Sequence, residues 1–372
     1  MNSVNPVKKI LYIILAALNA VCIITAAILY IVFAAMSSRL ASQNISESWS
    51  AGNEEKYDQL SVFFADGYGI GYDEVRRIRT DLEKKLTENS LEAKNDNSRL
   101  YIYSFSCTPY LQTVTTMSDS YAPNVEAETI VTGGDFFLFH QLRLISGSYY
   151  SDDELMQDRV VINDVLAWQL FGASEVSGMA VKINGRIYSV AGVVTLEDDK
   201  ASDYLVGGKP YMFMPFDTLS EAPPTAKCFE AVLPSPVKDL AKTMLADAVG
   251  TDEKGCSIIV NSSRFSFLNC LKAAFDGGRS AVVDKSIVYP YWENAARITL
   301  ANAADTAAAI VFLAVVPILT VLYFAGLLFH KRKAIIHNIT ENIRDKYDDL
   351  SEKMRKKQRI AKVKKTMKGG NL

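Results

Sequence analysis

The sequence has few of the residues, and none of the motifs, that mark a familiar type of enzyme. It contains only three histidines, two of which, His330 and His337, lie in a strongly basic C-terminal segment. The third, His140, is better explained by packing or surface exposure than by a Ser-His-Asp triad. There is no HExxH pair and no GxxxxGKS/T loop, because the nearest match at residues 207–209 is followed by Pro210. We therefore expect a non-enzymatic protein that does not itself hydrolyse ATP and holds no cofactor.

Cysteine and acidic patterns do not form a metal-site motif either. The five cysteines have no CxxC spacing, and a domain of this size does not depend on disulfides to fold. One or two disulfides and buried thiols are both compatible with the sequence. The acidic runs at residues 152–154 and 197–199 have the oxygen ligands that Ca²⁺ prefers. Solvated turns explain both runs as well, and we predict no metal site.

Two long stretches lack charged residues altogether, at residues 10–36 and 306–329. About 20 apolar residues are enough for a helix to cross the hydrocarbon core of a bilayer, so we predict a transmembrane helix in each. A cleaved signal peptide is the alternative for the first stretch, which is longer than the apolar region of such a peptide. A buried core helix is the alternative for the second, where Pro317 predicts a kink. Residues 37–57 favour a helix that continues above the membrane.

Charge is distributed unevenly around these stretches, although the whole chain carries a net charge of only −2. Residues 1–9 contain two lysines and no acid, and residues 330–372 contain fourteen basic and five acidic side chains. Residues 37–298 contain 24 basic and 36 acidic side chains. Because basic segments stay on the cytoplasmic side, we predict a double-pass protein of the plasma membrane, with both termini cytoplasmic and residues 37–298 outside.

The outer segment predicts an α+β extracytoplasmic domain built from two β-α-β units. Residues 59–65 and 100–106 predict strands on either side of a helix at residues 73–89. Apolar residues recur in that helix every three or four positions. The same strand–helix–strand order recurs at residues 227–234, 237–249 and 256–260.

A mostly β insert separates the two units, from about residue 129 to residue 219. Short strand patterns alternate there with turns that contain glycine and aspartate, and one helix is predicted at residues 164–171. Asn184-Gly185 lies between two of these strands and indicates a type I′ hairpin turn, in which both residues take a positive φ. Four bulky side chains are expected to anchor this small module, namely Phe136, Phe137, Trp168 and Phe171.

The insert carries residues that resemble the extracytoplasmic core domain of MacB-type permeases. The likeness starts at Gly133-Gly134-Asp135-Phe136-Phe137, continues through Leu170-Phe171-Gly172, and ends with the Asn184-Gly185 hairpin and its exit strand. We interpret these residues as markers of the fold and not as a ligand site, with glycines supplying positive φ or close backbone approach. The full set is Gly133, Gly134, Asp135, Phe136, Phe137, Asn163, Leu170, Phe171, Gly172, Asn184, Gly185 and Gly192.

The resemblance implies a subunit of an ABC transporter, in which ATP hydrolysis in the cytoplasm is relayed through membrane helices to the outer domain. MacB-type permeases have three membrane helices after that domain, whereas this sequence has one apolar stretch there. The implied partners are therefore a separate ABC ATPase and a full-length, four-helix permease subunit. The target would be a peptide, a lipid-linked molecule or a cell-wall hydrolase. The alternative is an ATP-independent sensor or scaffold that uses the outer domain only for partner binding.

The C-terminal segment combines an apolar stripe, with members three and four positions apart, with dense positive charge. Such a segment fits contact with anionic membrane lipid or packing on a partner protein. A basic run beside a membrane is poorly placed to bind nucleic acid, so we predict none. The basic side chains with the strongest case for lipid or partner contact are Lys331, Arg332, Lys333, Lys356 and Lys357.

Overall fold

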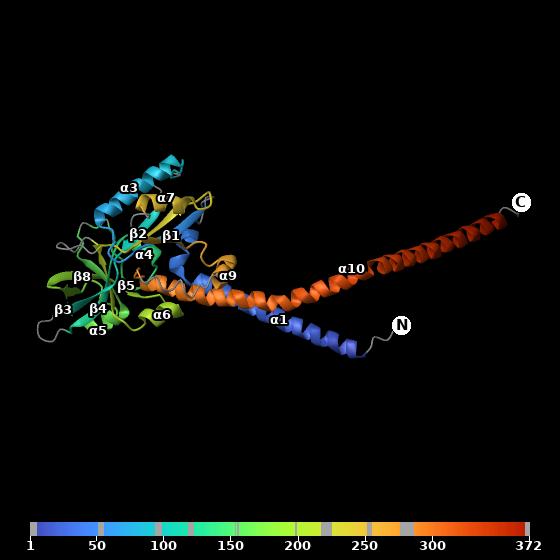
Figure 1. The fold of residues 1–372 in the computed structure, drawn as a ribbon, viewed down its shortest axis with the longest axis horizontal. Coiled ribbons are helices and arrows are strands. Elements are labelled where there is room, and N and C mark those ends of the chain that lie inside the picture. Colours follow the sequence, from blue (N-terminus) through green and yellow to red (C-terminus); the bar gives the residue numbers. More distant parts are fainter. Residues whose placement is uncertain are drawn as a thin grey trace. The chain divides into compact units, whose positions relative to one another are not determined.

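The structure, a computed structural model, describes residues 6–50, 56–93, 99–117, 123–152, 154, 156–197, 199–216, 225–250, 255–275 and 286–368 (Figure 1). Two units are distinguished by their internal contacts. The larger unit is Ile28–Ile310, and the smaller combines Met1–Ala27 with Val311–Leu372.

In the larger unit, the two predicted β-α-β units interleave in one sheet. The first consists of β1 (Tyr57–Phe64), α3 (Tyr72–Glu88) and β2 (Ile102–Ser106). The second consists of β10 (Cys228–Pro234), α7 (Leu240–Val249) and β11 (Cys256–Val260). The order across the sheet is β11-β1-β10-β2, and all neighbours are antiparallel. Both units are confirmed, in the split β-α-β arrangement.

Helix α3 packs on this sheet through the apolar stripe that its sequence predicts. Val75, Ile78, Leu82 and Leu86 are all buried, and they share one core cluster with Leu60 of β1. Helix α7 contributes to the same cluster and contacts both α3 and β1. The spacing of three and four residues therefore places one face of α3 on the core.

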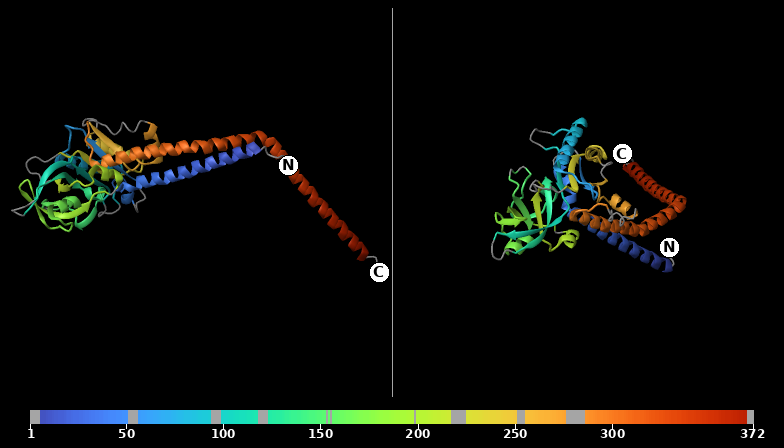
Figure 2. Two further views of the ribbon diagram at one scale, coloured as in Figure 1. Left: turned by 90° about the horizontal axis from the view of Figure 1, so that it is seen from below. Right: turned by 60° about the vertical axis from the view of Figure 1, so that its left-hand side comes forward.

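The predicted β insert is a small closed barrel (Figure 2). Its strands pair in the ring order β4-β3-β7-β8-β6-β9, and parallel pairing of β9 with β4 closes the ring. Helix α5 (Asp164–Phe171) packs against the barrel strands, and β5 (Arg143–Gly147) adds to β8. The bounds of the ring strands are β3 (Tyr110–Thr116), β4 (Val125–Gly134), β6 (Arg159–Asn163), β7 (Ala180–Ile183), β8 (Arg186–Thr195) and β9 (Tyr211–Pro215).

Strand β4 belongs to both the barrel and the sheet. Its last three residues, from Thr132 to Gly134, pair with β2, while its earlier residues pair with β3 and β9. Because β3 and the first four residues of β4 precede residue 129, the barrel uses residues ahead of the expected insert. Residues 217–219, at the expected end of the insert, lie outside the described residues.

The hairpin between β7 and β8 is the predicted type I′ turn. Asn184 and Gly185 have φ values of 47° and 83°, and they connect the paired residues Ile183 and Arg186. Both central residues therefore have the positive φ that this turn requires.

Both uncharged stretches are helical. They lie in α1 (Pro6–Arg39) and α10 (Tyr291–Lys368), in which Pro6–Met36 and Tyr291–His330 are long and apolar enough to cross a membrane. In the smaller unit the two helices are in contact, because the Asn19 side-chain amide donates to the Thr320 hydroxyl at 3.1 Å. Helix α10 continues through Pro317. A kink there stays a prediction.

The helix expected at residues 37–57 is interrupted, which corrects that prediction. Helix α1 ends at Arg39 and is followed by a 3₁₀ turn η1 (Ala41–Gln43) and a short helix α2 (Ile45–Ser50), while residues 51–55 lie outside the described residues. The break turns Ser42 and Gln43 into the domain, where both are buried. Further helices, not predicted from the sequence, are α4 (Phe136–Phe139), α6 (Lys200–Val206) and α9 (Phe267–Phe275).

Candidate functional site

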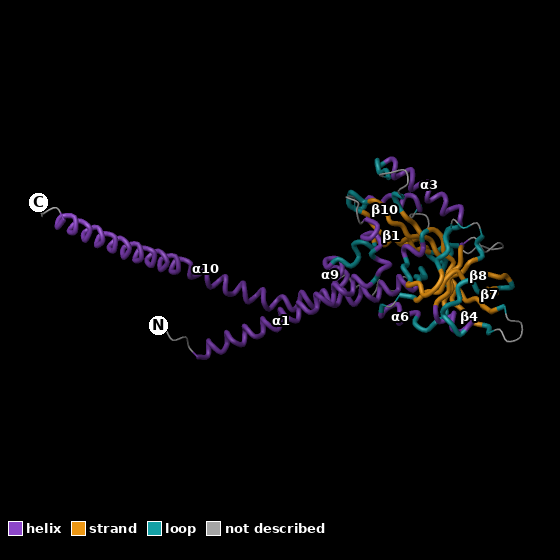
Figure 3. The backbone as a smooth tube through the Cα atoms, turned by 180° about the vertical axis from the view of Figure 1, so that it is seen from behind, coloured by secondary structure: helices purple, strands orange, loops and turns teal. Residues whose placement is uncertain are grey.

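The first two turns of α10 are buried in the outer domain, although the same helix continues into an apolar membrane segment (Figure 3). Tyr291, Trp292 and Glu293 are 6%, 2% and 1% exposed, and Ala295 and Ala296 are fully buried. We call residues Tyr291 to Arg297, together with the side chains that contact them, the α10 junction. Every residue of this junction belongs to the larger unit.

A buried ion-pair cluster is centred on Glu293. Arg264 donates from Nη1 to Glu293 Oε2 at 2.8 Å and from Nη2 to Oε1 at 3.0 Å. One turn further along α10, Arg297 Nε donates to Oε1 at 2.7 Å. All three side chains are at most 10% exposed. Because removing one member leaves an uncompensated buried charge, such a cluster holds its elements in one arrangement.

The same cluster reaches the end of α1. Arg264 Nη1 also donates to Gln43 Oε1 at 3.4 Å, in the turn that follows α1. Gln59 of β1 fixes this turn further, since its amide donates to the Ser42 carbonyl at 2.5 Å and accepts from Ile45 N at 3.0 Å. Both helices that lead toward the membrane are therefore anchored to the sheet by buried polar contacts.

A second buried polar cluster lies where Trp292 meets the sheet. His140 Nε2 is 2.8 Å from Glu230 Oε2, and both side chains are almost completely buried. Ser61 and Ser104 donate hydroxyl hydrogen bonds to the same carboxylate, at 3.1 and 3.3 Å. The His140 ring packs on Trp292 with centroids 4.4 Å apart.

This second cluster does not form a catalytic triad. The partner of the imidazole is the carboxylate, and the hydroxyls of Ser61 and Ser104 bond to that carboxylate and not to the ring. His140 is fully buried, so a substrate would not reach it. Of the two roles expected for His140, packing and surface exposure, the structure shows packing.

A third contact joins the barrel to the start of α10. The Tyr291 hydroxyl, at the first residue of α10, donates to Glu197 Oε2 at 2.8 Å, just beyond the end of β8. Burial raises the pKa of the Glu197 carboxyl, and the nearby His140 ring acts in the opposite direction. Glu197 Oε1 is buried, and it has no hydrogen-bond partner among the described residues.

A groove of about 510 Å³ lies beside the junction on its membrane side. Its lining includes Met36 of α1, Leu40 just after α1, Tyr204 of α6, and Ile298 and Asn302 of α10. The groove is bounded by the barrel side of the domain and by both membrane helices, so a shift of either helix would change its shape.

The Gly-Gly-Asp-Phe-Phe motif ends β4 and also contacts the α10 junction. Phe136 packs on Trp292 and on Phe213 of β9, with ring centroids 5.7 Å away in each case. Asp135 accepts two hydrogen bonds from the Arg99 guanidinium, and Gly134 has a φ of 66°. The motif therefore turns the chain from β4 into α4, which His140 follows directly.

The other Gly-Gly-Asp-Phe-Phe residues pack closely. An added Cβ at Gly133 would lie 2.2 Å from Cζ of Phe105 on the neighbouring strand β2. The Phe137 ring stacks on the Tyr149 ring with centroids 4.6 Å apart. These contacts hold the seam between sheet and barrel closed.

The remaining motif residues support the barrel. Asn163 caps α5 by accepting from Leu166 N at 3.0 Å, and it also accepts from Tyr211 N at 2.9 Å. Leu170 is buried, Phe171 packs partly on the core, and Gly172 ends α5 with a φ of 67°. An added Cβ at Gly192 would lie 2.5 Å from the Ser148 carbonyl oxygen. Trp168 is 60% exposed, so the prediction that it anchors the module was wrong.

The cysteines and acidic runs show no metal cluster among the described residues. None of the five cysteines, all of which lie in the described residues, forms a disulfide. Four of them are buried, and burial raises the pKa of Cys107 to about 12. Asp199 caps α6 by accepting from the backbone of Ala201 and Ser202. Asp153 and Asp198, in the middle of the two acidic runs, lie outside the described residues.

The basic tail residues lie on the last part of α10. Lys356 pairs with Glu352 at 2.8 Å in an exposed position, and Lys357 is exposed. The side chains of Lys331, Arg332 and Lys333 lie outside the described residues. The apolar stripe is exposed at Ile339, Ile343, Tyr347, Leu350 and Met354.

The junction was not predicted from the sequence. Arg264 and Glu293 are 29 positions apart, and neither residue has a local pattern that indicates the other. The one signal available was the acidic Glu293 ahead of the second uncharged stretch, since a charge close to a membrane segment needs a partner.

Comparisons with known proteins found a matching family model and similar solved structures. The family model for the MacB-like periplasmic core domain matches residues 15–243, which is more than half of the chain. A search of curated proteins found no match. Among solved structures, the periplasmic region of MacB from Actinobacillus actinomycetemcomitans is 16% identical, with a TM-score of 0.37. That alignment covers 55% of this chain and 89% of the other.

The extracellular domain of the noncanonic ABC-type transporter YknZ from Gram-positive bacteria is also similar. It is 14% identical with a TM-score of 0.35, and the alignment covers 54% of this chain and 99% of the other. The family match, and the two apolar helices on either side of the matched domain, identify the architecture. The chain belongs to the MacB-like periplasmic core domain family and is a membrane protein of the ABC transporter permease type, with an extracytoplasmic domain between two membrane helices.

Proposed function

We propose that this chain is a permease-like subunit that transmits movement, driven by a separate ABC ATPase, from the cytoplasm to its extracytoplasmic domain. The observation that carries the proposal is the buried contact of Glu293 with Arg264 and Arg297. This contact lies in the first turns of a helix that continues to Lys368 without an assigned break. A displacement of α10 near the membrane would therefore be passed to the sheet and not absorbed in a linker.

The tail of α10 offers a surface on which a cytoplasmic partner can act. The exposed apolar stripe recurs at three and four positions, at Ile343, Tyr347, Leu350 and Met354, among charged residues of both signs, and a densely basic run follows at residues 353–368. An ABC ATPase, or a full-length permease subunit, fits this amphipathic surface. In the proposal, the outer domain receives the movement and presents it to a peptide, a lipid-linked molecule or a cell-wall target.

The partner half of the proposal is tested by purifying the tagged full-length protein in mild detergent and identifying co-purifying proteins by mass spectrometry. Recovery of an ABC ATPase with a four-helix permease supports the subunit. Loss of both with Tyr347→Lys, but not with Glu352→Lys, would locate the contact on the stripe, since both changes add a lysine at an exposed position. Recovery of neither protein favours an ATP-independent sensor or scaffold.

The second part of the proposal, that movement reaches the outer domain, is tested with a fluorescent label on that domain. Ile187 is 57% exposed on the barrel, so a fluorophore at an Ile187→Cys site reports changes around it. We expect an ATP-dependent signal in the assembled complex and its loss with Glu293→Gln. Arg297→Lys keeps the charge and serves as a milder variant if Glu293→Gln does not fold. An unchanged signal in both folded variants would contradict transmission through the junction.

A further inference from the structure

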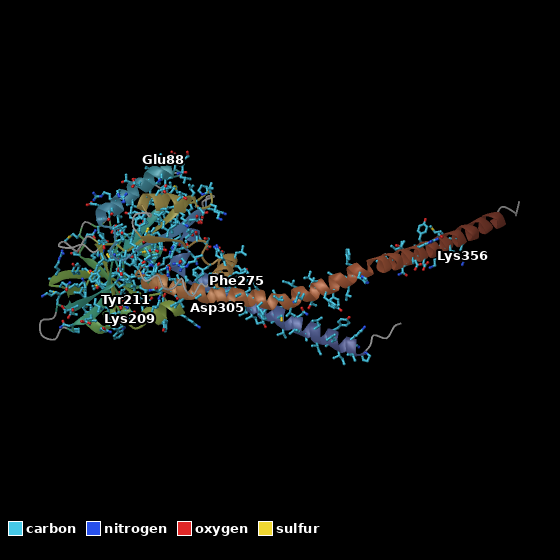
Figure 4. The ribbon with its side chains drawn as sticks, in the orientation of Figure 1. Glu88, Lys209, Tyr211, Phe275, Asp305 and Lys356 are labelled. Atoms are coloured by element: carbon cyan, nitrogen blue, oxygen red, sulfur yellow. The ribbon has the colours of Figure 1, made fainter. Side chains whose placement is uncertain are left out.

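Helix α9 exposes large apolar side chains on a folded domain. Leu268 and Phe275 are 75% and 77% exposed, and the exposed Lys272 lies between them in the sequence. Figure 4 labels Phe275 at the end of α9. Spacings of four and three residues place all three on one face of the helix. This face would leave a large apolar surface in water if nothing covered it.

The opposite face of α9 packs against the two membrane helices. Cys270 is fully buried in a cluster with Phe33 of α1 and with Ala303 and Ala307 of α10. The ring of Phe267 meets the ring of Phe33 edge-on, with centroids 5.6 Å apart. The small alanine side chains allow α9 to approach α10 closely, and α9 is seen beside α10 in Figures 1 and 3.

The residues that α9 contacts show where it lies relative to the ends of the two uncharged stretches. Phe33 lies three residues inside the end of the uncharged stretch at residues 10–36, which is about 5 Å at the rise of an α-helix. Ala303 and Ala307 lie on either side of Thr306, where the second uncharged stretch begins. Two independent sequence markers therefore put α9 at the same level, the edge of the hydrocarbon core.

We propose that α9 is an interfacial helix that lies in the outer leaflet of the bilayer. Leu268 and Phe275 enter the boundary between headgroups and acyl chains, and Lys272 extends its ammonium group to the lipid phosphates. We assign lipid as the occupant because α9 packs on Phe33 of α1, within one turn of Tyr30 and Ile31, whose apolar side chains are 57% and 67% exposed in the uncharged stretch. The proposal is independent of any ATPase, since it concerns only how the domain is seated on the membrane.

The test uses the full-length protein in nanodiscs of phosphatidylcholine and phosphatidylglycerol. Phe275→Trp and Leu268→Trp each add one fluorophore to the proposed face, and the unsubstituted protein gives the signal of the native tryptophans. Val237→Trp is the matched control, because Val237 is also apolar and 65% exposed but belongs to the segment before α7.

We expect lipid brominated near the glycerol end of its chains to remove most of the added fluorescence at positions 268 and 275, and little of it at position 237. Lipid brominated at the chain ends should quench less, because the helix lies at the boundary. Quenching no greater than at position 237 would overturn the proposal. A blue-shifted emission without bromine quenching would also overturn it, because protein would then cover this face.

Discussion

Glu293 and Arg264 meet in two nearly parallel hydrogen bonds of 2.8 and 3.0 Å, in a place where neither side chain is more than 7% exposed. Arg264 follows the last strand of the sheet, and Glu293 opens the helix that enters the membrane. The pair therefore joins the outer domain to its second membrane helix through charge, in addition to the packing of Tyr291 and Trp292.

Replacement of Glu293 by glutamine should lower the free energy of unfolding by about 3–5 kcal/mol, because Arg264 and Arg297 would be left as buried charges. Glu352→Gln removes the exposed pair with Lys356 and should cost no more than about 1 kcal/mol. Thermal unfolding of the full-length protein in detergent, followed by tryptophan fluorescence, measures both. Equal losses of unfolding free energy in the two variants would show that the buried pair stabilises the protein no more than the exposed pair does.

The stability of the outer domain should fall as pH rises, in part through Glu197. Burial raises the pKa of this carboxyl, so the folded protein holds its proton more tightly than the unfolded chain. Its contribution is complete below the ordinary value of 4.5 and is lost as the pH rises through the raised pKa.

Glu197→Gln keeps an acceptor for Tyr291 and removes the titration. The melting temperature of the variant, measured at several values from pH 4.5 upward, should therefore fall less steeply than that of the unsubstituted protein. Glu154→Gln is the control, because Glu154 pairs with Arg159 in a half-buried position away from α10. Parallel pH profiles of the Glu197→Gln variant and the unsubstituted protein would exclude this role of Glu197.

Gly185→Val should weaken the barrel hairpin, because Gly185 has a φ of 83° and the left-handed region costs a side chain with a Cβ about 1–2 kcal/mol. Gly185→Asn should have a smaller effect, since asparagine tolerates this region better. A steric clash does not contribute to the expected effect, because no atom lies within 4 Å of a Cβ added at Gly185. Unfolding of the two variants should rank them in this order, and equal stability of Gly185→Val and the parent would contradict the turn.

Reporter fusions test the predicted orientation, which rests on charge alone. A reporter that works only outside the cytoplasm should be active when it is fused at residue 200, in α6, and inactive when it is fused at residue 372. A reporter that works only in the cytoplasm should give the reverse result. A fusion at residue 9 should behave like the one at residue 372. The opposite pattern at residues 200 and 372 would exclude the orientation with both termini cytoplasmic.

The parts of the fold that were predicted correctly from the sequence depend on local patterns. The stripe on α3 needs only a repeat of three and four, and Asn184-Gly185 needs only the φ preferences of two residues. The closure of the barrel could not be predicted from the sequence, because the β4–β9 pair joins Glu128 to Tyr211 and no turn connects them. Long-range pairing of this kind is set by packing and not by local preference.

The junction was missed for a related reason, and one anchor was placed wrongly. Glu293 and Arg264 are ordinary charged residues in the sequence, and only the fold brings them together in a buried place. Trp168 was expected inside because of its size, yet its position on α5 turns most of its ring to solvent. Gly133 was marked correctly as a close approach, although the sequence does not indicate that Phe105 fills the space.

Strand β4 has a consequence for how the outer domain can be taken apart. One continuous backbone supplies the edge on which β2 pairs and two walls of the barrel, so the barrel has no boundary at which the chain could be cut without breaking a ladder. Excision of residues 129–219 would leave β3 paired with the first four residues of β4, but it would remove β9 and the β4 residues that pair with β2, and so open the ring. Barrel and sheet therefore form one cooperative folding unit, and their amide protons should exchange together and not as two autonomous modules.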